Sequence, residues 1–194
     1  LHISVTAANT IVAKPGLLNS NQISSSDFID LERTLFSKGY YNSDIANTTT
    51  HLPLSPVIEL LARARNGIIS QSDADAQINV LKQFDFRNDL LKYIYRNGIN
   101  QQYAASFNGG GSNSRYYFSA GLDKNQTSLQ GNDYRRITLR SANTFSLTKK
   151  LQFDAALSFT NTFTQNNSPG GYGSYTYGSN RKIYPYARLV DGNG

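Results

Sequence analysis

The sequence predicts a segment of a transmembrane antiparallel β-barrel, with about five strands and a mostly helical insertion after the first strand. Three observations lead to this prediction. Apolar and polar residues alternate through strand-length segments at the N-terminus and again after residue 100. Short turns and longer polar loops alternate between those later segments, as they do in barrels that cross a membrane. Mean hydropathy is only −0.46, which a barrel tolerates because only alternate residues face lipid.

The composition narrows the class further. Of the 194 residues, 39% are hydrophobic and 12% are aromatic, and the chain has no Cys, Met or Trp. No window approaches the roughly 18 consecutive apolar residues of a membrane-spanning helix. The net charge of +6 comes from scattered Lys and Arg residues without a basic track interleaved with aromatics, so no nucleic-acid partner is predicted. A soluble β-rich domain is the competing class.

Both ends of the chain have an unusual character. The sequence opens at Leu1, without Met or a signal peptide, and it closes on the turn-like run Asp191-Gly192-Asn193-Gly194. Neither end resembles a natural terminus, so we expect a fragment of a longer protein.

The first expected strand covers residues 1–13. Leu1, Ile3, Val5 and Ala7 alternate with more polar neighbours, which is the pattern of a strand with one apolar face. The Pro15-Gly16 pair then ends it.

Residues 14–99 are expected to form a helical insertion. Ser55-Pro56 suits the N-cap and first turn of a helix, and Ser70 with Asp73 resembles a capping box. Gly39 and Gly67 are the expected stops, and a short fourth helix is expected from Asp89 to Tyr95. The apolar faces expected to pack are Phe28, Leu31 and Leu35, then Val57, Leu60, Leu61 and Ala64, then Ile78, Leu81 and Phe84.

Residues 100–163 return to a period of two and are expected to form antiparallel barrel strands with tight turns. Turns are expected at 109–114 and 148–150, and a longer polar loop from Lys124 to Asp133. Residues 164–194 are expected to be a long Gly/Tyr-rich loop and the start of the next element. The expected inward faces are polar and carry Asn108, Arg136, Arg140 and Asp154, which suits a wet or plugged lumen. Tyr116, Tyr134 and Phe163 lie at strand ends, where interfacial aromatic girdles form.

Several runs resemble a known family. The runs 101–110 and 115–122, QQYAASFNGG and RYYFSAGL, resemble the hairpin with a GG turn and a yyxSxGY strand found in SusC/RagA-like TonB-dependent outer-membrane transporters. The run 132–143, NDYRRITLRSAN, is similar to their xdyxRxtxRxN strand. Residues 27–32 and 39–41 resemble the insertion after the first barrel strand. The resemblance covers nearly the whole chain in order, and it departs at Leu122-Asp123, where the family often has Gly-Tyr.

This resemblance implies a 22-stranded plugged barrel, to which the chain would contribute the first five strands. It implies a location in the outer membrane of a Gram-negative bacterium of the Bacteroidota. Members import glycans or peptides with energy from TonB, which acts through a plug that this chain lacks, often beneath a SusD-like lipoprotein lid. The implied partners are therefore lipid, plug, lid and an oligosaccharide or peptide substrate, with the helical insertion in the first outward loop.

Two groups of residues are candidate sites on this interpretation. Arg136 and Arg140 are expected to face the lumen, where they either pair with plug carboxylates and line the import path or are simply solvated; Asp154 shares that face. Tyr172, Tyr175 and Tyr177 are substrate-contact candidates, because tyrosine rings stack well on sugars and peptide side chains. The alternative is a loop packed on its neighbours.

Nothing in the sequence predicts an enzyme, a metal site or a cofactor. The two histidines, His2 and His51, are far apart in the sequence, and neither has a carboxylate at a metal-ligand spacing. The glycines at 109–111 lack the Lys and Ser/Thr of a phosphate-binding loop. Two further function classes stay open: an outer-membrane barrel without a TonB link, and a secreted soluble carbohydrate-binding β-domain.

Overall fold

A computed structural model describes residues 1–47, 49–178 and 181–190. The C-terminal end of the expected long loop, residues 191–194, lies outside the described residues, as do 48, 179 and 180. The chain divides into two compact units. The sheet unit is Leu1–Pro15 with Tyr95–Ser168, and the helical unit is Gly16–Ile94 with Pro169–Gly194.

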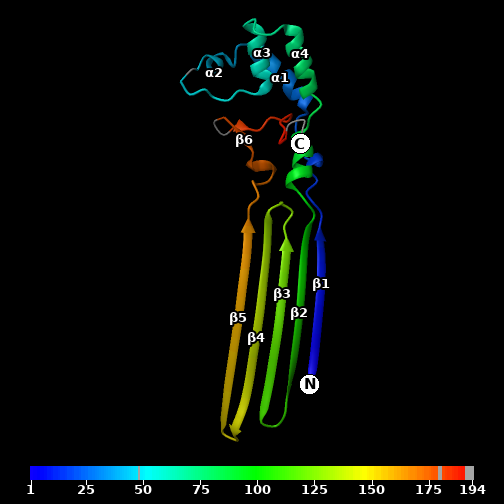
Figure 1. Cartoon of the computed structure of the whole chain (residues 1–194), viewed down its shortest axis with the longest axis vertical. Helices are drawn as coiled ribbons and strands as arrows, with labels where there is room; N and C mark the ends of the chain where they lie inside the picture. The colour runs from blue at the N-terminus through cyan, green and yellow to red at the C-terminus, as the bar shows by residue number, and fades with distance from the viewer. Residues whose placement is uncertain (48, 179–180, 191–194) are drawn as a thin grey trace. The chain divides into compact units, whose positions relative to one another are not determined.

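The sheet unit is a five-stranded antiparallel meander, and Figure 1 shows its long strands side by side. The sheet is open, with the first and last strands at its edges, so the predicted antiparallel sheet is confirmed but it does not close on itself. In sequence and spatial order the strands are β1 (His2–Val12), β2 (Gly98–Gly110), β3 (Ser114–Gln126), β4 (Asn132–Thr148) and β5 (Leu151–Asn166).

The connections from β2 through β5 are all short. Residues 111–113 join β2 to β3, 127–131 join β3 to β4, and 149–150 join β4 to β5. The prediction of a long loop from Lys124 to Asp133 is wrong, because Gln126 still pairs with Asp133. Polar side chains at strand ends do not stop the backbone ladder, which needs only peptide groups. The contrast between short and long connections is therefore weaker than the sequence suggested.

One end of the sheet, which we call the loop end, carries the connections to the helical unit. There β1 finishes with Val12 opposite Gly98, the first residue of β2, and β5 finishes with Asn166 opposite Asn132. Arg96 stabilises this end, because its guanidinium donates to the carbonyls of Thr127 and Asn132 and forms an ion pair with Asp133 at 2.7 Å. The other end, the turn end, carries the two tight turns.

The helical unit begins with a 3-10 turn, η1 (Leu17–Asn19), followed by α1 (Ser25–Ser37), α2 (Asn42–Ala46), α3 (Pro56–Arg65), α4 (Gln71–Leu81) and α5 (Phe86–Asp89). A π-helical turn, η2 (Leu90–Ile94), extends α5. The predicted caps are confirmed: Ser55 accepts from the Ile58 amide, and Ser70 accepts from the Asp73 amide. Ser24 caps α1 in the same way through the Asp27 amide. No helix among the described residues is both long and apolar enough to cross a membrane.

The core of the helical unit lies between α1, α3 and α4. The predicted α3 face is confirmed, since Val57, Leu60 and Leu61 are buried. The predicted α1 face is only partly right: Phe28 packs against the buried cluster, but Leu31 is 45% exposed, and the buried residues are Ile29 and Glu32. The helix turns its Ser25–Ile29–Glu32 side inward because that side has polar partners for its two hydrophilic members. The central buried cluster is Ile29, Val57, Ile58, Leu60, Leu61, Ala74, Ile78 and Tyr186.

The last part of the chain also belongs to the helical unit. We call residues 169–178 and 181–190 the tail segment; it contains η3 (Tyr172–Ser174), β6 (Thr176–Tyr177) and β7 (Arg181–Lys182). Tyr186 is fully buried in the helical core, and the Phe86 amide donates to the carbonyl of Pro185 at 2.8 Å. The sequence placed these residues in a long loop, but their apolar side chains are packed on the helices.

Candidate functional site: the two faces of the sheet

The candidate site is the sheet itself, whose two faces differ sharply in chemistry. Opposed residues in an antiparallel ladder lie on the same face, so the register assigns every side chain to one side. Ile3 pairs with Phe107, Phe107 with Phe118, and Phe118 with Ser141, which pairs with Leu157. This row belongs to the apolar face, which takes the odd-numbered residues of β1, β2, β4 and β5 and the even-numbered residues of β3.

The apolar face has no cover within the described residues. Large side chains of this face are exposed on β1, β2, β4 and β5: Val5 is 76% exposed, Leu157 73% and Phe159 53%. Those of β3 are half-buried between their neighbours. Soluble monomers seldom expose large contiguous apolar patches, and such patches mark surfaces that contact a partner or a membrane. The face is therefore suited to burial against another apolar phase.

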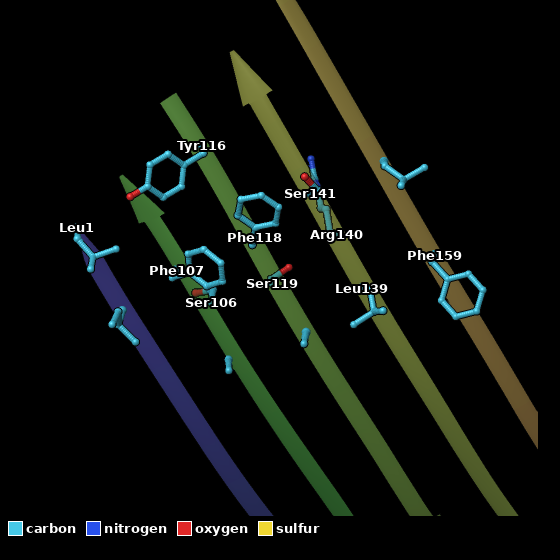
Figure 2. A pocket seen from close by; sticks show the side chains of 14 residues that line it. Leu1, Ser106, Phe107, Tyr116, Phe118, Ser119, Leu139, Arg140, Ser141 and Phe159 are labelled. Carbon is cyan, nitrogen blue, oxygen red and sulfur yellow. The ribbon is translucent and has the colours of Figure 1, made fainter. Parts of the chain in front are cut away.

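Aromatic pairs across strands order this face. The rings of Phe107 and Phe118 stack with their centroids 4.9 Å apart, and Tyr116 lies edge-on to Phe107 at 6.4 Å. Figure 2 shows these rings on neighbouring strands beside Leu139 and Phe159, where they line a shallow apolar groove. Cross-strand aromatic pairs stabilise a sheet and fix its register.

The polar face carries the predicted lumen-facing candidates together. Arg136, Arg140 and Asp154 all lie on it, as does Asn108. Arg136 forms an ion pair with Asp123 on β3, with Nη2 and Oδ2 2.7 Å apart. This contact holds one of the two predicted arginines against the wall of the sheet.

Asp154 and Arg140 have different surroundings on that face. The Asp154 carboxylate accepts from Thr144 at 2.6 Å and from Gln152 at 2.8 Å. Arg140 lies between Ser119 and Ser158 in the ladder and makes no ion pair among the residues that the structure describes. Of the two arginines, Arg140 therefore has the guanidinium that is more available to an external anion.

The predicted aromatic girdle is only partly on the apolar face. Tyr116 pairs with Asn143, and Phe163 pairs with Arg135, so both rings belong to the apolar face. Tyr134 lies on the polar face in the same row as Asn125, because strict alternation places it with Arg136. Tyr134 therefore does not belong to a ring of aromatics on the apolar side.

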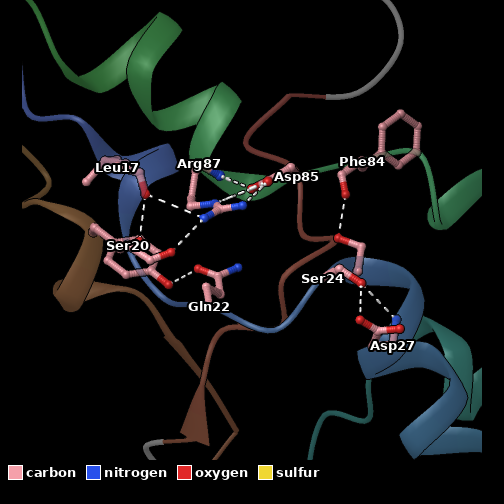
Figure 3. Close-up of polar contacts among 10 residues, drawn as sticks. Leu17, Ser20, Gln22, Ser24, Asp27, Phe84, Asp85 and Arg87 are labelled. Atoms are coloured by element: carbon pink, nitrogen blue, oxygen red, sulfur yellow. Dashed lines mark hydrogen bonds and ion pairs between the residues drawn. The ribbon is translucent and has the colours of Figure 1, made fainter.

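The three predicted substrate-contact tyrosines are anchored in the helical unit. The Tyr172 hydroxyl donates to Gln22, in the polar cluster of Figure 3, and the Tyr175 ring meets Phe86 edge-on at 5.2 Å. Tyr177 meets Tyr184 edge-on at 5.2 Å. All three are half-buried, so each presents only part of its ring to solvent.

Sequence reasoning missed a buried polar cluster in the helical unit. The Glu32 carboxylate accepts from Ser55 Oγ at 2.5 Å and from the Tyr186 hydroxyl at 2.7 Å. Burial raises the pKa of Glu32, and these two hydrogen bonds only partly offset that effect. One sequence signal for the cluster exists: the aromatic run Ile183-Tyr184-Pro185-Tyr186 is too apolar for a solvated tail.

Sequence reasoning also missed the polar contacts around Arg87. Its guanidinium binds Asp85 at 2.6 Å and donates to the carbonyls of Leu17 and Ser20, as Figure 3 shows. These hydrogen bonds join segments that are about 70 residues apart, so no local sequence pattern predicts them.

The described side chains form no group of three His, Asp or Glu residues that could hold a metal ion. No protein-family model matches the chain, and no curated protein matches it. The two-faced sheet is thus the feature on which a function must be argued.

Proposed function

We propose that this chain is part of a TonB-dependent outer-membrane transporter that imports glycans or peptides. On this proposal the sheet unit is an arc of the barrel wall, and the helical unit belongs to the outer vestibule. The apolar face meets lipid and the polar face meets the lumen. Further strands, a plug that contacts TonB and a SusD-like lipoprotein lid would come from outside this chain.

The observation that carries the proposal is the exposed apolar face. Its strands contain between 11 and 17 residues, at or above the 9–11 residues that a tilted strand needs to cross a bilayer. The opposite face carries Arg136, Arg140 and Asp154, which suit water and not hydrocarbon. The outer edges of β1 and β5 pair with no other strand among the described residues, which supports the idea that the sheet continues into neighbouring strands.

The polar face also supports a role in passage of a hydrophilic cargo. Small and hydroxylated side chains, such as Ser106, Ser119 and Ser158, leave room there beside Arg140. A sugar hydroxyl or a peptide carbonyl finds hydrogen-bond donors on such a surface, and a carboxylate finds a cation. The arginines then act on cargo or plug through charge and hydrogen bonding, without covalent chemistry.

The absence of Trp from the chain allows a direct test of the two faces. Two variants, Leu157→Trp and Ser158→Trp, introduce a single indole on the apolar and the polar face of β5 respectively. The chain is refolded with phospholipid vesicles whose acyl chains are brominated, since bromine quenches an indole within the hydrocarbon. We expect strong quenching at position 157 and weak quenching at 158.

The contrary outcomes are distinct. Equal quenching at both positions contradicts a sheet that has one lipid face and one lumen face. A chain that stays soluble and monomeric without lipid or detergent favours the secreted carbohydrate-binding β-domain instead.

Transport is tested in the bacterium that makes the protein. Deletion of the gene should abolish growth on one glycan or peptide source, and removal of TonB should have the same effect. Replacement of Arg136 and Arg140 by Gln should reduce uptake while the amount of assembled barrel stays normal. Unchanged growth on all sources without TonB would favour an outer-membrane barrel without a TonB link.

A further inference from the structure

Among the described residues of the helical unit, Glu32 is the one carboxylate that is buried in the core. Glu32 is 2% exposed. Each of its two carboxylate oxygens accepts a hydrogen bond from one hydroxyl, that of Ser55 at the start of α3 or that of Tyr186 in the tail segment. Three segments that are distant in sequence therefore meet at a single carboxyl group.

No cation among the described residues forms an ion pair with Glu32. The ion pairs among the described residues of the helical unit join other carboxylates: Arg33 binds Asp75, Lys82 binds Asp30, Arg87 binds Asp85 and Arg181 binds Asp44. A buried carboxylate with two hydrogen bonds and no positive partner is costly. The neutral acid removes the charge and can still meet both hydroxyls, provided that its own O–H donates to one of the two hydroxyl oxygens while its carbonyl oxygen accepts from the other. Burial accordingly raises the pKa of Glu32 above its ordinary value of 4.5.

The other ionisable groups around Glu32 are tyrosines, which keep their protons in the same range. Burial, followed by the charge of Glu32, raises the pKa of Tyr41 to about 12, and the same two causes raise the pKa of Tyr177. The pKa values of Tyr184 and Tyr186 are also raised, first by burial. Glu59 on α3 is exposed, and Arg181 is held by Asp44. Because these tyrosines have raised pKa values, Glu32 is the group of this cluster whose raised pKa starts from an acidic value, 4.5.

We propose that Glu32, Ser55 and Tyr186 form a proton-dependent latch, which holds residues 181–190 on the helices while Glu32 is protonated and loosens them when its carboxyl ionises. On ionisation the carboxyl proton passes to water and the charge stays on Glu32. Tyr186 covers that carboxyl, so its displacement is the route by which water reaches the new charge. The inference concerns the helical unit alone and does not depend on the proposed transport.

The sign of the pH effect follows from the direction of the shift. A carboxyl whose pKa is raised in the folded state contributes its full stabilisation below its unfolded value near 4.5. That contribution is lost as the pH rises through the folded pKa. The latch is thus closed in mild acid and opens toward alkaline pH.

The chain contains only two glutamates, Glu32 and Glu59, which permits a direct titration. Selective ¹³C labelling of the glutamate carboxyl yields two resonances in the intact chain, with Glu59 as the exposed reference. We expect the Glu32 resonance to titrate at a distinctly higher pH than the Glu59 resonance. Titration of both resonances together would overturn the proposal, and this measurement requires no substitution.

Amide exchange measures the opening itself. The Phe86 amide donates to Pro185 and the Leu189 amide donates to Asp89, so both report on contacts of the tail segment. Their protection factors should fall as the pH rises from about 4.5, by up to about tenfold per pH unit, and should level off above the folded pKa of Glu32. Glu32→Gln should remove this decline, because the amide stays neutral, whereas the matched exposed control Glu59→Gln should retain it. An unchanged decline in Glu32→Gln would contradict the latch.

Discussion

Arg87 illustrates how single side chains organise the helical unit. Its guanidinium forms an ion pair with Asp85, two residues earlier in the chain. It also donates hydrogen bonds to the carbonyls of Leu17 and Ser20, which are far away in the sequence. Asp85 in turn caps α5 by accepting from the Arg87 amide at 2.9 Å. One ion pair therefore fixes both the start of a helix and the path of η1.

We predict that this ion pair makes the helical unit sensitive to acid. Burial alone would raise the pKa of Asp85, but hydrogen bonds from Arg87 outweigh it and hold the pKa below its ordinary value of 3.8. A lowered folded pKa contributes stability above 3.8 that is lost as the pH falls through the folded value. The urea midpoint of the helical unit should therefore fall on acidification below pH 4 by more in the unmodified chain than in Asp85→Asn. Parallel curves for the two proteins would refute this role.

Residues with local signals were predictable, and residues with distant partners were not. The caps at Ser55 and Ser70 follow from their own helices, because a cap bonds only to the next turn. Glu32 was not predictable, since its burial depends on Tyr186, 154 residues later. Likewise, alternation places Arg136 and Arg140 on one face, but only the register shows that Asp123 engages the former.

At the scale of elements, the spacing of hydrophobic residues predicts which face of a strand a side chain occupies more accurately than it predicts which face of a helix is buried. Each β residue has only two directions, so alternation in β2 to β5 is enough to assign it. A helix of 13 residues offers a continuous range of rotations, and α1 selects the side of Ile29 and Glu32 and leaves Leu31 exposed. Strand ends were less predictable, because polar residues such as Lys124 continue the ladder.

The β2–β3 hairpin provides a test of tight backbone packing at its turn. A Cβ at Gly110 would overlap the carbonyl oxygen of Ser114 and lie 2.9 Å from Arg115 Cα, and neither backbone atom can rotate away. Gly110→Ala should therefore destabilise the sheet by about 1–3 kcal/mol, the usual cost of overpacking. The matched control is Gly111→Ala, one residue further on, where no heavy atom lies within 4 Å of the added carbon. Equal urea midpoints for both variants in detergent would contradict this prediction, because they would mean that the backbone of the turn shifts to accommodate the added methyl group.

At the scale of the whole molecule, the chain builds two units by interleaving them. The helical insertion leaves the sheet after β1 and returns at β2, where Val12 and Gly98 are paired neighbours. Because Val12 and Gly98 are already adjacent, a short turn could join β1 to β2 in place of the insertion. The sequence predicted the insertion from its change of period, but it did not predict that the tail segment completes the same unit.

We therefore predict that the sheet survives removal of the insertion. Replacing residues 14–96 by Asn-Gly should close a β1–β2 hairpin, because this dipeptide favours the turn that joins antiparallel strands. The variant should still associate with vesicles. Its tail segment should lose its cover, so chymotrypsin should cleave after Tyr186, which is 1% exposed in the intact chain. Continued protection of Tyr186 would mean that the helices are not what buries it.

The meeting of Glu32 with Tyr186 also constrains the order in which the chain can fold. Their hydrogen bond spans 154 residues, with all of β2 to β5 between them. During synthesis the helices around residue 29 emerge long before the tyrosine that fills their centre, so their core stays unfinished until nearly the last residues of this sequence have been made. Contacts of such long range make folding slow and leave apolar surface open in the meantime. The helical core therefore cannot be completed before Tyr186 has been made.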